Sequence, residues 1–440
     1  MDLASLYAQH AETLAAGTAA ALEACGYDAV ILAGGRAATR NRFDDQDAPL
    51  SPTPAFSHWV PVVEADALLV IEPGQRPTLH RTLVDDFWHA PARLELDHVG
   101  EQVARATRRA GDALALPRGR VAVISRDDAD DGVPAELPRN PPALLAALDA
   151  LRVHKTPYEL ACLRLAQRGA ARGHQAAAAA FAAGDASGPS ELALHLAYLA
   201  ASGQDPDATP YKGIVALGAN AAVLHYTAYQ ATAPGVADTS LLVDAGARHL
   251  GYGADITRTY ARGAGAAARR FADLIARVDE LQQTVCAEVR PGVAYEDLHE
   301  RTHVLLAELG RAAGLLRGGT EELVARGVTR ALLPHGLGHS LGIVTHDVGC
   351  RPRPPRPHNP FLRMTIDLAV GHVVTIEPGL YFIPSLLAPL RADDRAALVD
   401  WDAIAELAPF GGIRIEDDVA VTADGHENLT RDAFAELAPS

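Results

Sequence analysis

Two aspartates lie at the edges of neighbouring apolar segments in the second half of the chain. Asp244 follows the run 241–243, and Asp255 precedes the run 256–260. They are eleven positions apart with a turn expected near 248–250, so the two carboxylates should face each other in a hairpin. Opposed carboxylates repel unless a cation lies between them, and a divalent metal ion is the simplest such cation. On these two residues alone, a strand end and a turn cap remain an equal alternative.

Three histidines follow in a glycine-rich run. His335 and His339 have the spacing of the helical zinc motif in which two histidines flank a glutamate, but that glutamate is missing and Gly336 and Gly338 stand between them. The run is therefore interpreted as a loop, and a zinc protease of the helical-motif class is excluded. With His346 seven residues further on, three histidines on one loop favour a functional site over isolated core histidines.

Two glutamates end apolar segments nearer the C-terminus. Glu377 follows 373–376, and Glu416 follows 412–415, where strand alternation puts Arg414 on the same face as Glu416. A buried glutamate needs a positive partner, either an arginine or a metal ion. A plain ion pair with Arg414 would explain Glu416 alone, but not both glutamates together with both aspartates.

Together these residues form a ligand set rich in oxygen, with one or two imidazoles and no sulfur. Such a set suits Mn²⁺ or Co²⁺, with Zn²⁺ as a further choice, better than it suits a structural zinc site. Four carboxylates carry as much negative charge as two divalent ions supply positive charge. We therefore expect two metal ions, typically ~3.5 Å apart, with a water or hydroxide between them.

The elements that must position these side chains divide into two domains. The chain has 440 residues, of which 48% are hydrophobic, which is enough for two cores. The region 128–142 is rich in Pro, Asp and Gly, and Thr156 with Glu159 forms a capping box at the start of a long helix. We expect a small α/β domain over 1–153 and an α+β domain with a mainly antiparallel sheet over 154–440. Within the first domain, helices are expected near 96–113 and 142–153.

Composition limits where the protein can act. The 39 Lys and Arg against 55 Asp and Glu give a net charge of −16, which disfavours nucleic acid and anionic membranes as partners. The four cysteines form no CxxC pair, and the first residues lack a signal-peptide pattern. The longest alanine-rich run, 176–183, is too short to span a bilayer. We expect a soluble, cytoplasmic protein.

In their order, the candidate ligands resemble the five-residue metal site of the pita-bread metallopeptidases, the family of methionine aminopeptidase, aminopeptidase P and prolidase. These residues are Asp244, Asp255, His339, Glu377 and Glu416. Residues 220–226 and 335–347 are similar to the proline-specific branch. Residues 376–389, 43–45 and 59–61 are similar to the bacterial Xaa-Pro dipeptidases, or prolidases, which are close to the organophosphorus acid anhydrolases. The resemblance runs nearly end to end and implies a C-terminal pita-bread catalytic domain preceded by a smaller α/β domain.

The resemblance implies roles at the metal centre. The five ligands would hold two divalent ions per subunit, most of all Mn²⁺, and a hydroxide bridging the ions would attack the scissile carbonyl. Glu377 would accept and return the proton, and His346 would stabilise the oxyanion. His335 would line the pocket and help to move protons.

The resemblance also implies roles toward the substrate. Arg363 matches the family position that binds the terminal carboxylate of the dipeptide, with His225 beside it. Arg414 would support Glu416 and reach toward the substrate. The remaining substrate residues would be Tyr211 and Tyr226 as pocket walls, Asp45 for the substrate ammonium, and Trp88 in the same wall. In a homodimer, the N-terminal domain of one subunit would close the active site of the other.

These implications together describe a metal-dependent Xaa-Pro dipeptidase. The bond before proline is a tertiary amide without an N–H, so a site that relies on metals and a carboxylate clamp suits it. Two alternatives stay open within the enzyme class: hydrolysis of organophosphorus triesters as a main or side activity, and aminopeptidase P action on longer Xaa-Pro peptides. Pita-bread proteins that bind peptides without cleaving them lack the ligand set, so a binding module is disfavoured.

Overall fold

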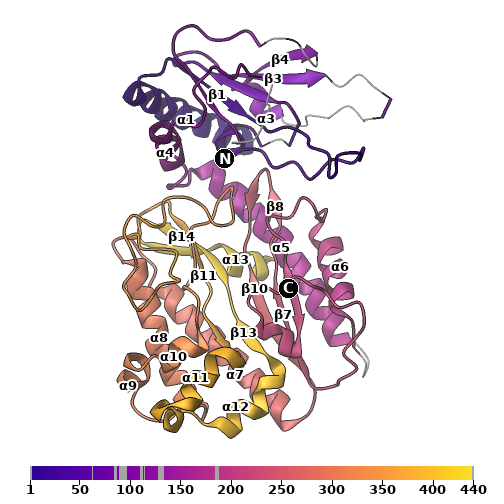
Figure 1. Ribbon diagram of the computed structural model, residues 1–440, viewed down its shortest axis with the longest axis vertical. Coiled ribbons are helices and arrows are strands. Elements are labelled where there is room, and N and C mark those ends of the chain that lie inside the picture. Colours follow the sequence, from indigo (N-terminus) through magenta and orange to yellow (C-terminus); the bar gives the residue numbers. More distant parts are fainter. Residues whose placement is uncertain are drawn as a thin grey trace. The chain divides into compact units, whose positions relative to one another are not determined.

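The structure is a computed structural model that describes residues 2–61, 63–83, 87–88, 97–109, 112, 114–126, 133–183 and 188–438 (Figure 1). The chain divides into two compact units, Met1–Cys162 and Leu163–Ser440, called unit 1 and unit 2 below. Among the described residues, no helix is both long enough and apolar enough to cross a bilayer.

Unit 1 is built on a five-stranded mixed sheet. The strand order is β4-β3-β2-β1-β5, in which β1 is antiparallel to β2 and parallel to β5, and β3 is antiparallel to β2 and parallel to β4. The strands β1, β2 and β5 are buried throughout, as their unbroken apolar runs predict. The elements are α1 (Leu3–Cys25), β1 (Ala29–Ala33), α2 (Pro54–Trp59), β2 (Leu68–Ile71), β3 (Thr78–Leu83), α3 (Asp97–Gly100), β4 (Ala104–Arg109), β5 (Val121–Ile124) and α4 (Pro142–Ala150).

The prediction of a helix over 96–113 is wrong. The region 96–113 contains a four-residue helix, α3, followed by the strand β4, which pairs residue by residue with Thr78–Leu83 of β3. Ala and Arg favour helix when taken alone, but here the ladder with β3 overrides their local preference. The helix expected near 142–153 is present as α4.

Unit 2 combines long helices with small antiparallel sheets, which confirms the expected α+β class. Its sheets have the strand orders β10-β7-β6, β11-β14-β15, β12-β13 and β8-β9, and every pairing is antiparallel. Isolated bridges join Thr257 to Glu416 and Ser340 to Val374. The helices are α5 (Pro157–Ala183, which begins in unit 1), α6 (Glu191–Ser202), α7 (Ala266–Ala287), α8 (Tyr295–Ala312), α9 (Thr320–Ala325), α10 (Val328–Leu332), α11 (Pro384–Ala392), α12 (Trp401–Leu407) and α13 (Leu429–Glu436), with 3-10 turns η1 (Gly218–Ala222), η2 (Asp394–Leu398) and η3 (Ala408–Phe410). The strands are β6 (Ile214–Leu217), β7 (Thr239–Asp244), β8 (Arg248–His249), β9 (Tyr252–Gly253), β10 (Thr257–Arg262), β11 (Val373–Ile376), β12 (Gly379–Tyr381), β13 (Gly412–Arg414), β14 (Asp417–Thr422) and β15 (Gly425–Asn428).

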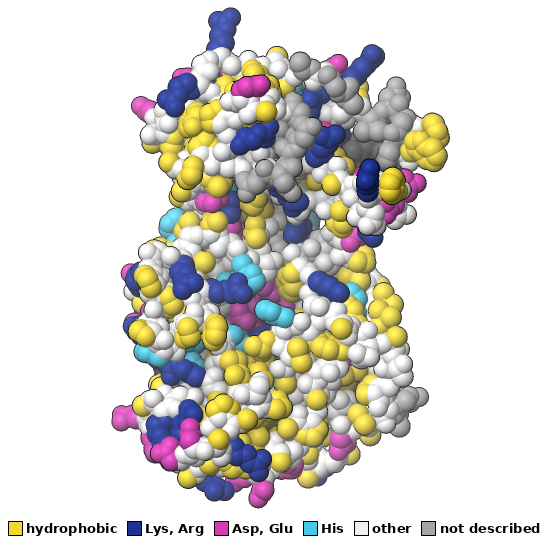
Figure 2. Space-filling model, viewed as in Figure 1, with side chains coloured by type: hydrophobic (Ala, Val, Ile, Leu, Met, Phe, Trp, Pro, Cys, Tyr) yellow, Lys and Arg dark blue, Asp and Glu magenta, His cyan; other side chains and the backbone are white. Residues whose placement is uncertain are grey.

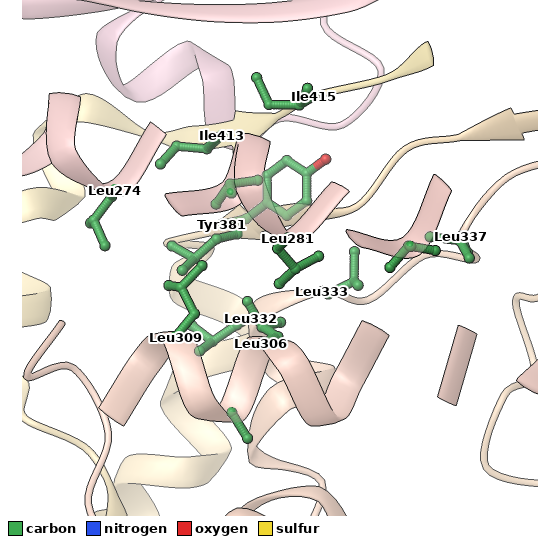
Figure 3. Packing of buried hydrophobic residues seen from close by; sticks show 14 of the residues in the cluster. Leu274, Leu281, Leu306, Leu309, Leu332, Leu333, Leu337, Tyr381, Ile413 and Ile415 are labelled. Carbon is green, nitrogen blue, oxygen red and sulfur yellow. The ribbon is translucent and has the colours of Figure 1, made fainter. Parts of the chain in front are cut away.

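The main core of unit 2 fixes the strands that carry the polar residues. Helix α7 places Phe271, Leu274, Val278 and Leu281 on one buried face, at the three- and four-residue spacing of an amphipathic helix. Figure 3 shows leucines of this core gathered around Tyr381 and beside Ile413, so the helices pack against β12 and β13. Each fully buried leucine contributes about 1.5–3 kcal/mol of hydrophobic free energy. The strand ends are therefore held by a large apolar core.

Candidate metal centre

The first two candidate ligands come from the hairpin of β7 and β10. Asp244 ends β7 and lies opposite Thr257 of β10, while Asp255 lies two positions ahead of that strand. The two aspartates are therefore not opposite each other as expected. Their carboxylates are joined instead by the Tyr211 hydroxyl oxygen, which is 2.8 Å from Oδ1 of Asp244 and 2.5 Å from Oδ1 of Asp255. The backbone N–H of Asp255 donates to Asp418, which fixes the turn.

The third candidate ligand, His339, lies on the expected loop. Its backbone N–H donates to Thr375 Oγ1 at 3.0 Å, and its Nδ1 lies 3.1 Å from the Ser340 carbonyl oxygen. A proton on Nδ1 satisfies that carbonyl, and Nε2 lies 3.4 Å from Asp255 Oδ2. This is the arrangement of a metal-binding histidine, in which the second ring nitrogen is held by a backbone acceptor.

The glycines of this loop have a steric reason. A Cβ at Gly338 would collide with the backbone carbonyl of Thr375 and with the Tyr295 hydroxyl. Only glycine therefore allows the loop to approach β11 closely enough to place His339.

The two glutamates enter from two further segments. Glu377 follows β11, and its Oε1 lies 3.8 Å from His339 Nε2. Glu416 lies between β13 and β14, and its Oε2 accepts a hydrogen bond from the Thr257 hydroxyl at 2.6 Å. One potential ligand atom from each of Asp255, His339 and Glu416 falls within 4.8 Å of the other two. Residues distant in sequence thus converge on one buried point.

The electrostatics show an excess of negative charge at this point. Burial, reinforced by the neighbouring aspartates, raises the pKa of Glu377 to about 7 and that of Glu416 well above its usual range. Burial lowers the pKa of His339, but the hydrogen bond and charge of Asp255 outweigh it and raise that pKa to about 9. Four acidic side chains around one imidazole are the donor set that hard divalent cations require, so these residues fit a metal centre.

The sequence suggested an ion pair between Arg414 and Glu416, but the structure pairs Arg414 with Asp244. Its guanidinium donates to Asp244 Oδ2 at 2.6 Å and to the Tyr381 hydroxyl at 2.8 Å, so the ion pair forms with Asp244 and not with Glu416. Tyr381 can then donate to His335 Nε2, 2.8 Å away, while His335 Nδ1 meets the Gly336 carbonyl oxygen at 2.8 Å. Burial and the charge of Arg414 lower the pKa of His335 to about 3, so this imidazole is neutral.

Three further candidates are exposed beside the ligands. The side chains of His225, His346 and Arg363 all reach solvent. The ring of His346 lies edge-on to His339, with centroids 4.4 Å apart. Burial, the charge of His339, and then Arg363 and His225 lower the pKa of His346 to about 4, which places these residues in one neighbourhood. Figure 2 shows acidic side chains in a hollow on this face of unit 2, with histidines around its rim.

The remaining candidates are Tyr226, Asp45 and Trp88. The Tyr226 hydroxyl donates to Glu191 Oε2 at 2.7 Å, and its ring packs on the cluster that includes Ile214. Asp45 and Trp88 belong to unit 1, where both are exposed.

Two matches with known families cover most of the chain. Residues 161–423 match the family described as metallopeptidase family M24, and residues 5–150 match the family described as the N-terminal domain of Xaa-Pro dipeptidase. The chain belongs to metallopeptidase family M24. It is 42% identical over 447 residues to the Xaa-Pro dipeptidase of Xanthomonas campestris pv. campestris strain B100, with 99% of both chains covered. It is 44% identical over 410 residues to that of Marinobacter nauticus, with 92% of this chain and 93% of the relative covered.

Solved structures confirm the pita-bread fold of this M24 metallopeptidase. Pseudomonas aeruginosa aminopeptidase PepP aligns with a TM-score of 0.70 at 23% identity, covering 99% of this chain and 97% of the other. Aminopeptidase P from E. coli with the inhibitor Pro-Leu aligns with a TM-score of 0.70 at 21% identity, covering 98% and 96%. At these identities the likeness concerns the fold alone.

Sequence reasoning missed three residues that hold candidate site residues in place. Thr257 bonds Glu416, Tyr381 links Arg414 to His335, and Glu191 accepts hydrogen bonds from Tyr226 and from the backbone of Leu217. A signal existed for Thr257, because strand alternation puts it on the same face as Asp255. Glu191 and Tyr381 carry no local signal, since their partners are distant in sequence.

Proposed function

We propose that this M24 metallopeptidase is an Xaa-Pro dipeptidase that cleaves the bond before a C-terminal proline. The observation that carries the proposal is the convergence of the full ligand set in a chain that is similar from end to end to Xaa-Pro dipeptidases. Two divalent ions, most of all Mn²⁺ with Co²⁺ or Zn²⁺ as substitutes, would supply a water of lowered pKa and polarise the scissile carbonyl. The residues that would hold them are Asp244, Asp255, His339, Glu377 and Glu416.

Around this centre the chain offers groups for proton transfer. Glu377 lies beside His339 with 17% of its side chain exposed, so it can exchange a proton with a bound molecule. His346 is neutral near pH 7 and can donate a ring N–H to the carbonyl oxygen as charge develops there. His335, held by Tyr381 and Gly336, lines the site as a neutral imidazole.

Arg363 is the proposed clamp for the terminal carboxylate of the substrate. Its guanidinium is exposed and forms no ion pair with any residue that the structure describes. His225 and His346 lie in the same neighbourhood, so an anion there would meet several hydrogen-bond donors. The proline nitrogen contributes no N–H, and a carboxylate clamp removes the need for one.

We propose that the enzyme is a cytoplasmic homodimer in which unit 1, corresponding to the expected domain 1–153, closes the active site of the partner. Unit 1 exposes Phe43, Phe87 and Trp88 with 93%, 86% and 76% of their surface accessible, which supports a covering partner. Asp45 would receive the substrate ammonium and Trp88 would add a wall. All four cysteines are free thiols, as a reducing compartment favours.

Removal and return of metal tests the proposal. Chelation should abolish hydrolysis of Gly-Pro, and Mn²⁺ should restore it, whereas the Asp255→Asn variant should remain inactive with metal present. Gly-Pro turnover that survives complete chelation would contradict the proposal. A p-nitrophenyl phosphotriester in the same assay measures the alternative activity, and we expect a kcat/KM well below that for Gly-Pro.

The proposed dimer has its own test. Phe43→Asp should shift the sedimentation coefficient toward a monomer and lower the turnover of Gly-Pro, since the closing residues would be lost. A monomer with full activity would contradict this arrangement.

A further inference from the structure

A second cluster of metal-binding side chains lies in unit 1, separate in sequence from the catalytic ligands. His10 comes from α1, His58 from the last turn of α2, and Glu159 from the first turn of α5. Their exposed fractions are 1%, 5% and 1%, and one potential ligand atom from each lies within 4.8 Å of the other two. Two imidazoles and one carboxylate are a known ligand set for Zn²⁺.

Two atoms of this cluster are buried without a hydrogen bond. His58 Nε2 and Glu159 Oε1 are 3.3 Å apart, yet neither has a hydrogen-bond partner among the described residues. A buried polar atom without a hydrogen bond lowers the stability of the fold. Two such atoms that face the same point therefore indicate that a bound partner belongs there. Two ligand atoms at 2.0–2.1 Å from a tetrahedral ion lie about 3.3 Å apart, which is the separation observed here.

The third ligand atom, His10 Nδ1, already accepts a hydrogen bond, unlike the other two. His10 Nε2 donates to the His58 carbonyl oxygen at 2.9 Å, so His10 Nδ1 carries the lone pair, 3.9 Å from Glu159 Oε2. The Thr156 hydroxyl, 2.8 Å from His10 Nδ1, donates a hydrogen bond to that lone pair, and an ion bound there would displace this bond. Glu159 Oε2 accepts the backbone N–H of Thr156 at 2.8 Å, which leaves Oε1 for an ion. A backbone carbonyl on the second ring nitrogen is the usual support of a ligating histidine.

Lys155, four positions before Glu159 in the chain, donates its ammonium to the Arg152 carbonyl oxygen, so this cation has a partner outside the cluster.

We propose that His10, His58 and Glu159 form a structural Zn²⁺ site in unit 1, with a water or the Thr156 hydroxyl as the fourth ligand. The ion would join α1, α2 and the start of α5, which are far apart in sequence. Metal binding to a site that exists only in the folded chain adds to the stability of the fold. The competing arrangement is a buried ion pair between a protonated His58 and Glu159.

The test measures Zn²⁺ bound to the full-length protein without reference to activity, so its failure is distinct from that of the proposed function. The variant His58→Gln keeps a donor for Glu159 but removes the imidazole. After chelation, reloading with Zn²⁺ and gel filtration, we expect this variant to hold about one equivalent less per chain than the unchanged protein. His80→Gln, a histidine of β3 outside the cluster, is the matched control and should lose none.

A second background removes the catalytic ligands. In a chain carrying Asp255→Asn and Glu416→Gln, added Zn²⁺ should still raise the Tm, and adding His58→Gln should abolish that rise. Should His58→Gln fold poorly, Glu159→Gln provides the same comparison. Equal Zn²⁺ content in the His58→Gln and unchanged proteins, or a Zn²⁺-dependent rise in Tm that survives His58→Gln, would identify a plain ion pair and overturn the proposal.

Discussion

The Tyr211 hydroxyl connects two of the proposed metal ligands. It lies between Oδ1 of Asp244 and Oδ1 of Asp255, two carboxylates that would otherwise repel each other. Tyr211→Phe keeps the ring and removes this contact. We expect metal affinity to fall by about 10–100-fold with the fold intact, as for other residues that orient metal ligands. Titration of the apo protein with Mn²⁺ measures this, and an unchanged affinity would show that the hydroxyl has no such role.

Arg363 sets the expected kinetics at the substrate end. Because a carboxylate clamp acts before the reaction as well as during it, Arg363→Ala should raise the KM for Gly-Pro more than it lowers kcat. Charge-assisted hydrogen bonds are worth about 1.5–3 kcal/mol, which corresponds to roughly a 10- to 150-fold change. Arg351→Ala removes another exposed guanidinium and should leave both constants unchanged. If KM stays constant in the Arg363 variant, another residue binds the carboxylate.

At the scale of the element, the loop that carries His339 depends on its close approach to β11. Gly338→Ala would press a methyl group against Thr375 and Tyr295, so the loop must shift. Overpacking of this kind typically costs about 1–3 kcal/mol, and the shift should also weaken metal binding. Gly319→Ala is the control, because a Cβ there meets nothing within 4 Å. Urea unfolding and metal content measure the two effects, and matching values for both variants would contradict this account.

Some features of the elements could be predicted from the sequence, and others depend on pairing between distant segments. The candidate ligands could be selected from the sequence because Asp244, Glu377 and Glu416 each end a buried apolar run, and His339 stands among glycines. The strand β4 was not predictable, because its residues become a strand only by pairing with β3. The partner of Arg414 depends in the same way on how β13 and β7 meet, which no local pattern encodes.

At the scale of the whole molecule, buried neutral histidines contribute to the response to acid. Burial is the main cause that lowers the pKa of His10, His174 and His299 to about 4 and that of His303 to about 2. Each stays neutral in the folded chain, while its unfolded counterpart gains a proton below about pH 6.5. At these four histidines the unfolded state therefore binds more protons between pH 6.5 and 4, so their contribution to stability falls as the pH falls through this range.

The loss of stability that these histidines cause at low pH can be measured. Each such histidine contributes up to about 3 kcal/mol of destabilisation by pH 4. The raised pKa values of Glu377 and Glu416 act in the opposite direction, so the test compares two proteins. As the pH falls from 6.5 to 4, His299→Leu should lose less free energy of unfolding than the unchanged protein, because it lacks one neutral buried imidazole. A parallel pH dependence of the two proteins would contradict the assignment of a neutral imidazole to His299.

The most direct measurement of the central claim compares Ala-Pro with Ala-Pro-Ala under Mn²⁺. In the proposed dipeptidase, Arg363 and His225 would meet a carboxylate one residue beyond the scissile carbonyl, whereas a tripeptide would present a neutral amide there. An unpaired charge in a closed site costs a few kcal/mol, so we predict a kcat/KM at least about 100-fold higher for Ala-Pro. Comparable values for the two substrates would contradict the account and assign the chain to aminopeptidase P activity.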